Sequence, residues 1–249
     1  MPFTAAHPAI IIPLQRLHSR WLSTTGLIVG SISPDFAYFL LGPRLSNLSH
    51  SLKGLLLFNL PMAFVLAIFF HVLVRDQVIQ YLPDYFRKKA LAIEPLRIGK
   101  YLLRNAYIFA ISVLIGAFGH LLWDSFTHYD GYFVRNNAFL LQPVSLGFIE
   151  VPLCRVLQHV STVVGFSILG WHISTLPSAT ITQKRWYAWI GYWILIGFIA
   201  AVFLLLNLPT HVHLSSLEKL VVPYLTGLLL AIVVLAILGK IRQLFSANS

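Results

Sequence analysis

The sequence predicts an all-α protein, a polytopic transmembrane helical bundle of about five to six spans. Of its 249 residues, 57% are hydrophobic and only 10% are charged. The mean hydropathy of +0.77 lies well outside the range of soluble domains. Several apolar runs are long enough to cross a hydrocarbon core of about 30 Å, which takes roughly 20 helical residues. These runs are continuous, whereas the strands of a membrane barrel alternate apolar and polar residues. We therefore expect helices embedded in a lipid bilayer.

The first apolar segment is too short to cross a membrane. Residues 9–14 are apolar but contain a proline, and basic residues follow, so the sequence predicts a short re-entrant or interfacial helix. The next run, residues 22–41, is the weakest predicted span because serines and the pair Pro34-Asp35 interrupt it. Part of it is expected to line a protein cavity. His7 reaches the outer face of the membrane only if the N-terminal segment doubles back on this run.

Five further runs predict the remaining spans. They cover residues 54–74, 106–123, 157–176, 186–206 and 220–239. Polar residues recur at spacings of three to four in the run that starts at residue 157, and such a stripe on a membrane helix usually faces protein. The last two runs are nearly featureless inside, which is typical of packing or anchoring helices. We therefore predict a membrane-embedded core at residues 1–176 and two appended transmembrane helices in residues 177–249.

The basic residues set the expected orientation of the spans. The net charge is +10, and seven bases lie in the loop that follows the 54–74 span: Arg75, Arg87, Lys88, Lys89, Arg97, Lys100 and Arg104. A short loop of this kind is cytoplasmic by the positive-inside rule. Lys184, Arg185, Lys240 and Arg242 fall on the same side if every span is crossed once. We therefore predict a cytoplasmic C-terminus, and we attribute the basic charge to membrane orientation and not to nucleic-acid binding.

Two ionisable side chains stand where a span should be apolar. His120 and Asp124 are four residues apart near the end of the 106–123 span, which places an imidazole and a carboxylate on one helical face. Because unpaired polar groups are costly at membrane depth, such a pair indicates a functional site. His50 directly precedes the 54–74 span, so it lies at the same outer face of the membrane.

The candidate site consists of six side chains: His7, Asp35, His50, His120, Asp124 and His128. Imidazole and carboxylate groups suit zinc, manganese or iron. The single cysteine, Cys154, excludes a multi-cysteine zinc site, and it is interpreted as a small buried apolar residue. A catalytic site would use three or four of the six side chains and leave a position for water, which the metal acidifies.

Each of these side chains also has a structural interpretation. His120 and Asp124 could form a plain hydrogen-bonded pair in a polar bundle. Asp35 could cap a helix or belong to a proton path. His50 could be an exposed turn histidine, and His128 lies two turns beyond His120 only if the helix does not fray before it.

Several short motifs occur in a fixed order along the chain. They are Met1-Pro2-Phe3-Thr4 with His7-Pro8, Gly30-Ser31-Ile32-Ser33-Pro34-Asp35-Phe36-Ala37-Tyr38-Phe39, Ser49-His50-Ser51, Gly119-His120-Leu121-Leu122-Trp123-Asp124-Ser125-Phe126-Thr127-His128, and Leu157-Gln158-His159-Val160-Ser161-Thr162. Together they resemble an uncharacterised bacterial integral-membrane family that carries a domain of unknown function. More distantly, they are similar to predicted inner-membrane metal-dependent hydrolases and to the His/Asp zinc sites of bacterial zinc-dependent phospholipases C.

The resemblance implies a set of ligands or catalytic groups. These are His7, Asp35, His50, His120 and Asp124, with His128 and His159 as further candidates. The chain lacks the Asp and His that the hydrolase group often carries after its Pro-Asp. It also lacks the downstream His-x-x-x-Glu of the phospholipases, because Glu150 has no histidine in register. These departures leave the number of metal ions open.

We therefore expect a membrane-embedded metal-dependent hydrolase at the outer face of the bacterial inner membrane, acting on a phosphoester or lipid-linked substrate. The metal, zinc before manganese or iron, is expected to be held by His50, His120 and Asp124. Asp35 would hold the metal or orient the water, and His7 or His128 would complete the ligand shell or act as acid and base. Two alternatives stay open, an ion or proton transporter that uses the His/Asp cluster and a non-catalytic membrane protein with a structural metal.

Overall fold

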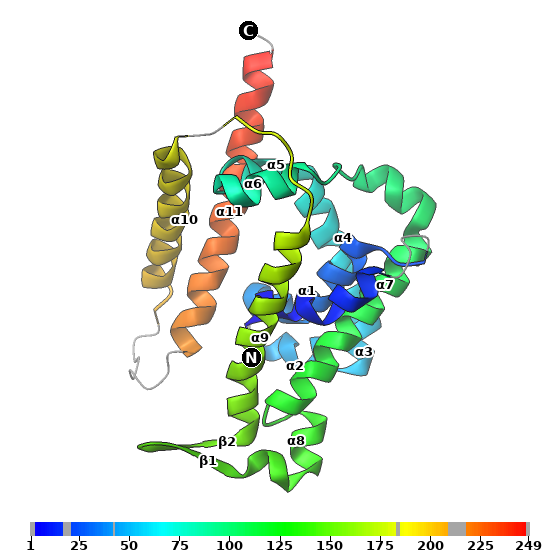
Figure 1. Cartoon of the computed structure of the whole chain (residues 1–249), viewed down its shortest axis with the longest axis vertical. Coiled ribbons are helices and arrows are strands. Elements are labelled where there is room, and N and C mark those ends of the chain that lie inside the picture. The colour runs from blue at the N-terminus through cyan, green and yellow to red at the C-terminus, as the bar shows by residue number, and fades with distance from the viewer. Residues whose placement is uncertain (1–2, 17–20, 42, 183–184, 209–217, 248–249) are drawn as a thin grey trace. The chain divides into compact units, whose positions relative to one another are not determined.

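Helices make up nearly all of the computed structural model, which describes residues 3–16, 21–41, 43–182, 185–208 and 218–247 (Figure 1). In chain order the elements are the 3-10 helix η1 (Thr4–Arg16), α1 (Thr24–Leu41), α2 (Pro43–Ser49), α3 (Leu52–Gly54), the π-helical turn η2 (Leu55–Asn59), α4 (Leu60–Phe69), a second π-helical turn η3 (Phe70–Val74), α5 (Arg75–Gln80), α6 (Asp84–Leu91), α7 (Ile98–Thr127), α8 (Tyr132–Asn136), the 3-10 helix η4 (Ala138–Leu141), β1 (Pro143–Leu146), β2 (Ile149–Pro152), α9 (Leu153–Thr175), α10 (Trp186–Leu206) and α11 (Glu218–Ala247). Lys184, one of the residues that predict the orientation, lies outside the described residues.

Five helical segments of the described chain are long and apolar enough to cross a membrane. They are Leu52–Gln80, Ile98–Asn136, Leu153–Thr175, Trp186–Leu206 and Leu220–Ser246. They correspond to the five strongest predicted spans, so the prediction of an all-α integral membrane protein with several spans is confirmed. Residues 22–41, the weakest predicted span, form α1 from Thr24 onward and are not among the five.

The chain divides into two compact units. The first unit contains residues 1–37, 41–67 and 102–175, and the second contains residues 38–40, 68–101 and 176–249. The first unit holds every candidate site residue. The predicted division into a core at residues 1–176 and two appended helices stays a prediction, and the second unit includes residues 68–101 as well as the last two helices.

Helices α1 and α7 pack backbone to backbone in the first unit. A Cβ atom on Gly30 would lie 2.3 Å from the Val113 carbonyl oxygen, and one on Gly116 would lie 2.3 Å from the Leu27 carbonyl oxygen. Only glycine permits so close an approach of two membrane helices. The approach brings the end of α1, with Asp35, against the end of α7, with His120 and Asp124.

The N-terminal helix η1 packs against α9. The backbone N–H of Phe3 donates a hydrogen bond to Thr162 Oγ1 at 3.3 Å, and a Cβ on Gly165 would lie 3.1 Å from Ala6. Gln158 of the same helix is buried. The predicted polar stripe on α9 therefore faces the N-terminal segment of the protein and not lipid.

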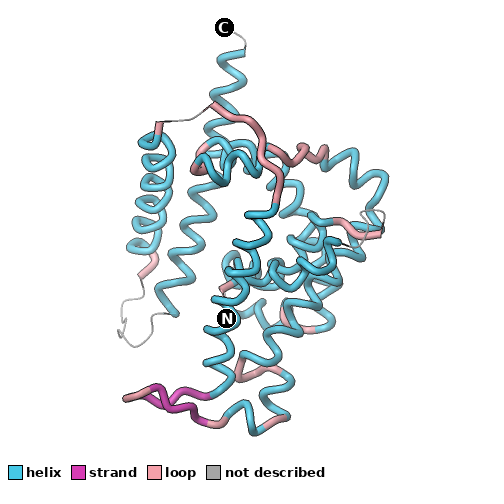
Figure 2. The backbone as a smooth tube through the Cα atoms, in the orientation of Figure 1, coloured by secondary structure: helices cyan, strands magenta, loops and turns pink. Residues whose placement is uncertain are grey.

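The segment between α7 and α9 is more regular than its sequence suggests. Residues 132–152 form α8, η4 and the antiparallel hairpin β1–β2 (Figure 2). Gly147 has a φ of +74° at the start of the two-residue turn, a conformation that glycine adopts readily and that closes tight hairpins. Cys154 follows the hairpin and is fully buried with Val134 and Leu140, which agrees with its interpretation as a core residue.

The second unit is organised around the pair of helices α10 and α11, which lie side by side in Figure 1. Tyr192 and Ile196 of α10 pack on Ala231 of α11. The Lys240 ammonium at the far end of α11 donates a hydrogen bond to the Val72 carbonyl at 2.7 Å. The Lys240 region of α11 therefore lies beside η3, within the Leu52–Gln80 span and three residues before Arg75.

Candidate metal site

Four potential metal ligands converge from separate elements of the first unit. Asp35 lies in α1, His50 directly follows α2, and His120 and Asp124 lie one turn apart in α7. One ligand atom from each lies within 4.8 Å of the others. The structure thus brings together four of the residues that the sequence singled out, although almost 90 residues of chain separate the first from the last.

The inner atoms of this cluster, which we call the His/Asp cluster, are two imidazole nitrogens and two carboxylate oxygens. His50 Nε2 lies 3.3 Å from Asp35 Oδ1 and 3.7 Å from Asp124 Oδ2. His120 Nε2 lies 3.3 Å from Asp124 Oδ2 and 3.6 Å from Asp35 Oδ1. Each imidazole nitrogen therefore faces both carboxylates.

The outer nitrogens of the two imidazoles are held by the backbone. His120 Nδ1 lies 2.8 Å from the Ser31 carbonyl oxygen, and His50 Nδ1 lies 3.0 Å from the Ser46 carbonyl oxygen. A carbonyl oxygen can only accept a hydrogen bond, so each Nδ1 carries the proton and donates it. In the neutral ring this leaves Nε2 with a lone pair, which is the tautomer that metal-binding histidines use.

The outer oxygens of the two carboxylates are held by η1. The Thr4 hydroxyl donates to Asp35 Oδ2 at 2.5 Å, and His7 Nε2 lies 3.2 Å from Asp124 Oδ1. Thr4 and His7 are three residues apart, so they share one face of a 3-10 helix. One face of the N-terminal helix therefore orients both acids of the cluster.

Two of the inner atoms lack hydrogen-bond partners. Within the described part of the chain, Asp35 Oδ1 and His120 Nε2 are fully buried and make no hydrogen bond. Acceptor atoms that face one another in a buried site repel, so the arrangement requires positive charge between them, either a metal ion or protons on the imidazoles. The donor set of two nitrogens and two oxygens fits a first-row metal.

His7 lies beside the four inner atoms and not among them. Its ring stacks on the His120 ring at a centroid distance of 3.8 Å, and its Nε2 contacts the outer oxygen of Asp124. The side chain is fully buried. His7 thus contacts the outer oxygen of Asp124, and its predicted role as a ligand or as acid and base stays a prediction.

His128 lies directly after the end of α7, next to Asp124. Its Nδ1 lies 3.2 Å from the Asp124 carbonyl oxygen and 3.5 Å from Asp124 Oδ1. Its Nε2 is buried and makes no hydrogen bond to the described residues. The helix thus persists far enough to bring His128 to the cluster, as the two-turn spacing from His120 requires. His159 is exposed on α9 and takes no part in the cluster.

The site has a closed end and an open end. The side chains of Asp35 and His120 have no exposed area, whereas His50 is 24% exposed and Asp124 is 10% exposed. His128 beside Asp124 is 19% exposed. Water or a substrate would therefore reach the cluster from the side of His50, Asp124 and His128.

Comparison with known protein families places these residues in a family. The profile described as a domain of unknown function, DUF4184, matches residues 1–237. The chain belongs to the DUF4184 family. No curated protein and no solved structure matches it significantly. The matched range of this DUF4184 protein includes all residues of the His/Asp cluster and the helix η1 that orients them.

Three partners of the cluster in this DUF4184 protein were missed by the sequence analysis. They are the Thr4 hydroxyl and the carbonyl groups of Ser31 and Ser46. The spacing of Thr4 and His7 could have indicated a shared face, had residues 4–16 been expected to form a 3-10 helix. The carbonyl groups carry no signal in the sequence, because any residue type offers the same acceptor.

Proposed function

We propose that this protein is a membrane-embedded metal-dependent hydrolase. The observation that supports the proposal most directly is the arrangement of the His/Asp cluster. Two imidazole lone pairs and two carboxylate oxygens face one another, and each of the four groups is held from behind by a hydrogen bond. Outer hydrogen bonds of this kind orient ligands and raise their basicity in metal sites.

The metal that suits these ligands best is zinc, with manganese or iron as alternatives. Zinc accepts imidazole and carboxylate ligands in a four-coordinate site, and catalytic zinc sites use three protein ligands and keep one position for water. We assign Asp35 and His120, at the closed end, and His50 as the three metal ligands. Asp124, at the open end, then lies beside the position for water. From the sequence we expected Asp124 to hold the metal and Asp35 to hold it or orient the water. Here Asp35 is the ligand, and Asp124 is placed to act on the water.

The open end holds the groups that would move protons. A divalent metal held by the cluster would act as a Lewis acid and lower the pKa of a bound water. Asp124 lies at the open end with its outer oxygen oriented by His7. His128 Nδ1 donates to the Asp124 carbonyl, and its Nε2 has no partner among the described residues, so it can accept or release a proton. A pair of this kind serves general acid and base catalysis.

The substrate that we propose is a phosphoester, including one linked to a lipid. His50 precedes the span that starts at Leu52, and Asp124 lies in the last turn of α7. The cluster therefore lies near the end of its helices, at the depth where lipid headgroups meet the hydrocarbon. Phosphoester oxygens are hard ligands that a divalent metal polarises well.

We also propose that the site opens at the outer face of the bacterial inner membrane and that the C-terminus is cytoplasmic. Seven bases lie between residues 75 and 104, and Lys240 near the C-terminus donates a hydrogen bond to Val72, three residues before the first of these bases. The positive-inside rule places such a face in the cytoplasm. Single cysteines placed at Phe3 or in the 75–104 loop test this orientation by labelling from outside intact cells. The cysteine at position 3 should react with the label, and the cysteine in the loop should not.

Metal content and hydrolysis together test the function. The purified protein should contain about one zinc, manganese or iron ion per chain by plasma mass spectrometry. His120→Ala and Asp35→Asn should lose it, whereas His159→Ala, an exposed histidine outside the cluster, should retain it. Loaded protein should cleave a phosphodiester in mixed micelles. If the purified protein binds no metal after incubation with each of the three, the proposal is wrong.

A transport assay separates the hydrolase from the proton or ion transporter. Purified protein in liposomes should release no proton or cation across the bilayer under conditions in which it hydrolyses substrate. If the parent protein instead carries protons or cations across the bilayer without hydrolysing substrate, and His120→Ala abolishes this flux, the transporter would be favoured over the hydrolase.

A further inference from the structure

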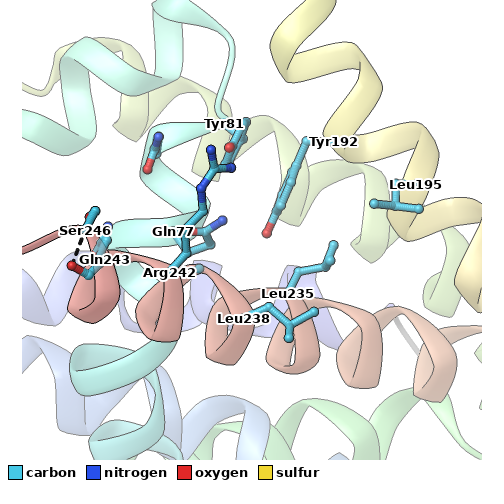
Figure 3. Close-up of a pocket in the computed structure, with 11 residues that line it drawn as sticks. Gln77, Tyr81, Tyr192, Leu195, Leu235, Leu238, Arg242, Gln243 and Ser246 are labelled. Carbon is cyan, nitrogen blue, oxygen red and sulfur yellow. Dashed lines mark hydrogen bonds between the residues drawn. The ribbon is translucent and has the colours of Figure 1, made fainter. Parts of the chain in front are cut away.

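The second unit contains a pocket that the proposed hydrolase does not use. Its volume is about 570 Å³, and it lies between α5, α10 and α11 (Figure 3). All of its lining residues belong to the second unit, and none belongs to the His/Asp cluster. A cavity of this size accommodates a large part of an amphiphilic molecule.

The lining changes from apolar to polar along α11. Leu235 and Leu238 line one end of the pocket, and Arg242, Gln243 and Ser246 line the other, as Figure 3 shows. The twelve residues from Leu235 to Ser246 span about 16 Å along the helix axis. Such a gradient matches a molecule with an acyl chain at one end and a polar headgroup at the other.

The polar end of the pocket lies near the end of the membrane helices. Helix α10 begins at Trp186, a residue type that prefers the membrane interface, and Tyr192 and Leu195 of the pocket are two to three turns further along. Gln77 and Gln80 complete the polar end from α5, next to the basic loop. The polar end is therefore at headgroup depth and the apolar end points into the hydrocarbon.

A buried hydrogen-bond donor lines this pocket without a partner. The Tyr192 hydroxyl is inaccessible and makes no hydrogen bond within the described chain, and the residue as a whole is 8% exposed. Figure 3 shows the hydroxyl directed toward α11. The Tyr81 ring stacks on the Tyr192 ring at 4.2 Å and fixes it in this orientation. A buried hydroxyl without a partner is rare, because its desolvation is not compensated, so it indicates an acceptor supplied by a ligand.

The charge of the pocket selects an anion. Arg242 is the charged residue among the described residues that line it, and none of these residues carries a carboxylate. An arginine guanidinium binds phosphate oxygens through two parallel hydrogen bonds. We propose that the pocket binds one anionic phospholipid of the surrounding bilayer, with its phosphate on Arg242, an ester or phosphate oxygen on the Tyr192 hydroxyl, and an acyl chain along Leu235 and Leu238. Basic pockets between membrane helices recognise anionic headgroups in this way.

Native mass spectrometry of the full chain in detergent tests the site. The probes are phosphatidylglycerol, which is anionic, and phosphatidylcholine, which is zwitterionic. The parent protein should retain one phosphatidylglycerol per chain and bind phosphatidylcholine at least tenfold more weakly. Arg242→Gln should weaken phosphatidylglycerol binding about tenfold, the effect of one charged hydrogen bond. Arg97→Gln, the same change at an exposed arginine of the second unit outside the pocket, should have no effect.

Tyr192→Phe gives a second, independent readout. The variant should bind phosphatidylglycerol a few-fold more weakly. It should raise the Tm of the lipid-free protein, because it removes a buried donor that only the lipid satisfies. Equal binding of the two lipids, or equal losses in the Arg242 and Arg97 variants, would overturn the proposal. Unchanged lipid binding and a lowered Tm in Tyr192→Phe would assign the hydroxyl to the fold and also contradict it.

Discussion

The Nδ1 atom of His120 donates a hydrogen bond to the Ser31 carbonyl oxygen at 2.8 Å. This contact joins α7 to α1 one turn beyond Gly116, where the two backbones pack closely. It also decides the chemistry of the ring, because it places the proton on Nδ1 and directs the Nε2 lone pair toward Asp35 and Asp124. One backbone contact thus converts a histidine in a membrane helix into a candidate ligand.

Thr4→Val is expected to weaken metal binding without removing a ligand. The valine keeps the shape of the side chain but cannot donate to Asp35 Oδ2. Loss of such an outer hydrogen bond typically costs about 10- to 100-fold in metal affinity. Competition with a chromogenic chelator measures the affinity. Thr4→Ser retains the hydroxyl and should stay within a few-fold of the parent, and equal affinities for Thr4→Val and the parent would remove Thr4 from the site.

His7→Gln separates an orienting role from a ligand role. The geometry places His7 on the outer oxygen of Asp124, so the variant should still bind one metal ion per chain, with an affinity about 10- to 100-fold lower. His50→Gln serves as the comparison, because it removes an inner nitrogen and should abolish stoichiometric binding. A His7→Gln protein that holds no metal at saturating concentration would restore His7 to the ligands.

The sequence predicted the membrane fold and the members of the His/Asp cluster for different reasons. The spans follow from the free energy of apolar residues in lipid, which depends on composition over some 20 residues and is visible in any window. The prediction of the cluster followed from the unfavourable free energy of placing Asp35, His120 and Asp124 in an apolar environment. Both arguments need no knowledge of contacts between distant segments, and both agree with the structure.

The finer geometry depends on contacts that no local pattern contains. Whether His7 is a ligand or a neighbour of a ligand depends on how η1 packs against α9, which is decided by Ala6 and Gly165, 159 residues apart. The hairpin between β1 and β2 was not predicted, because four-residue strands offer too little alternation of apolar and polar residues to detect. The pocket between α5, α10 and α11 has no sequence signature, because residues from three separate helices line it.

Chelation of the metal is expected to destabilise the protein. Without a metal ion, only protons on the imidazoles can compensate the charge of the buried carboxylates in the His/Asp cluster. A metal present at 100 times its Kd stabilises the native state by about 2.7 kcal/mol. Removal by a chelator should therefore lower the Tm in detergent, and zinc should restore it. The Asp35→Asn variant should show no response to either addition, and a parent protein equally insensitive would contradict a metal in the cluster.

Gly116→Ala is expected to disrupt the contact between α1 and α7. The added methyl group would lie 2.3 Å from the Leu27 carbonyl oxygen and 2.9 Å from the Ser31 backbone nitrogen. The helices must separate, and an overpacked contact costs about 1–3 kcal/mol. Gly170→Ala in α9 meets no atom within 4 Å and should be neutral or stabilising by up to about 1 kcal/mol. Thermal unfolding in detergent measures both variants, and equal Tm values would show that α1 and α7 tolerate a wider spacing.

His128→Asn tests the role of the histidine at the open end. The amide can still donate toward the Asp124 carbonyl, which His128 Nδ1 contacts at 3.2 Å, but it cannot take or release a proton near neutral pH. None of the inner atoms of the cluster belongs to His128, so the variant should bind one metal ion with the parent's affinity. Phosphodiester hydrolysis should fall about 10²- to 10⁴-fold, the usual contribution of a general acid or base. Loss of both metal and activity would instead make His128 a ligand. Full activity with metal bound would assign the proton transfer to Asp124 alone, since Asp124 is the other group at the open end that we do not assign to the metal.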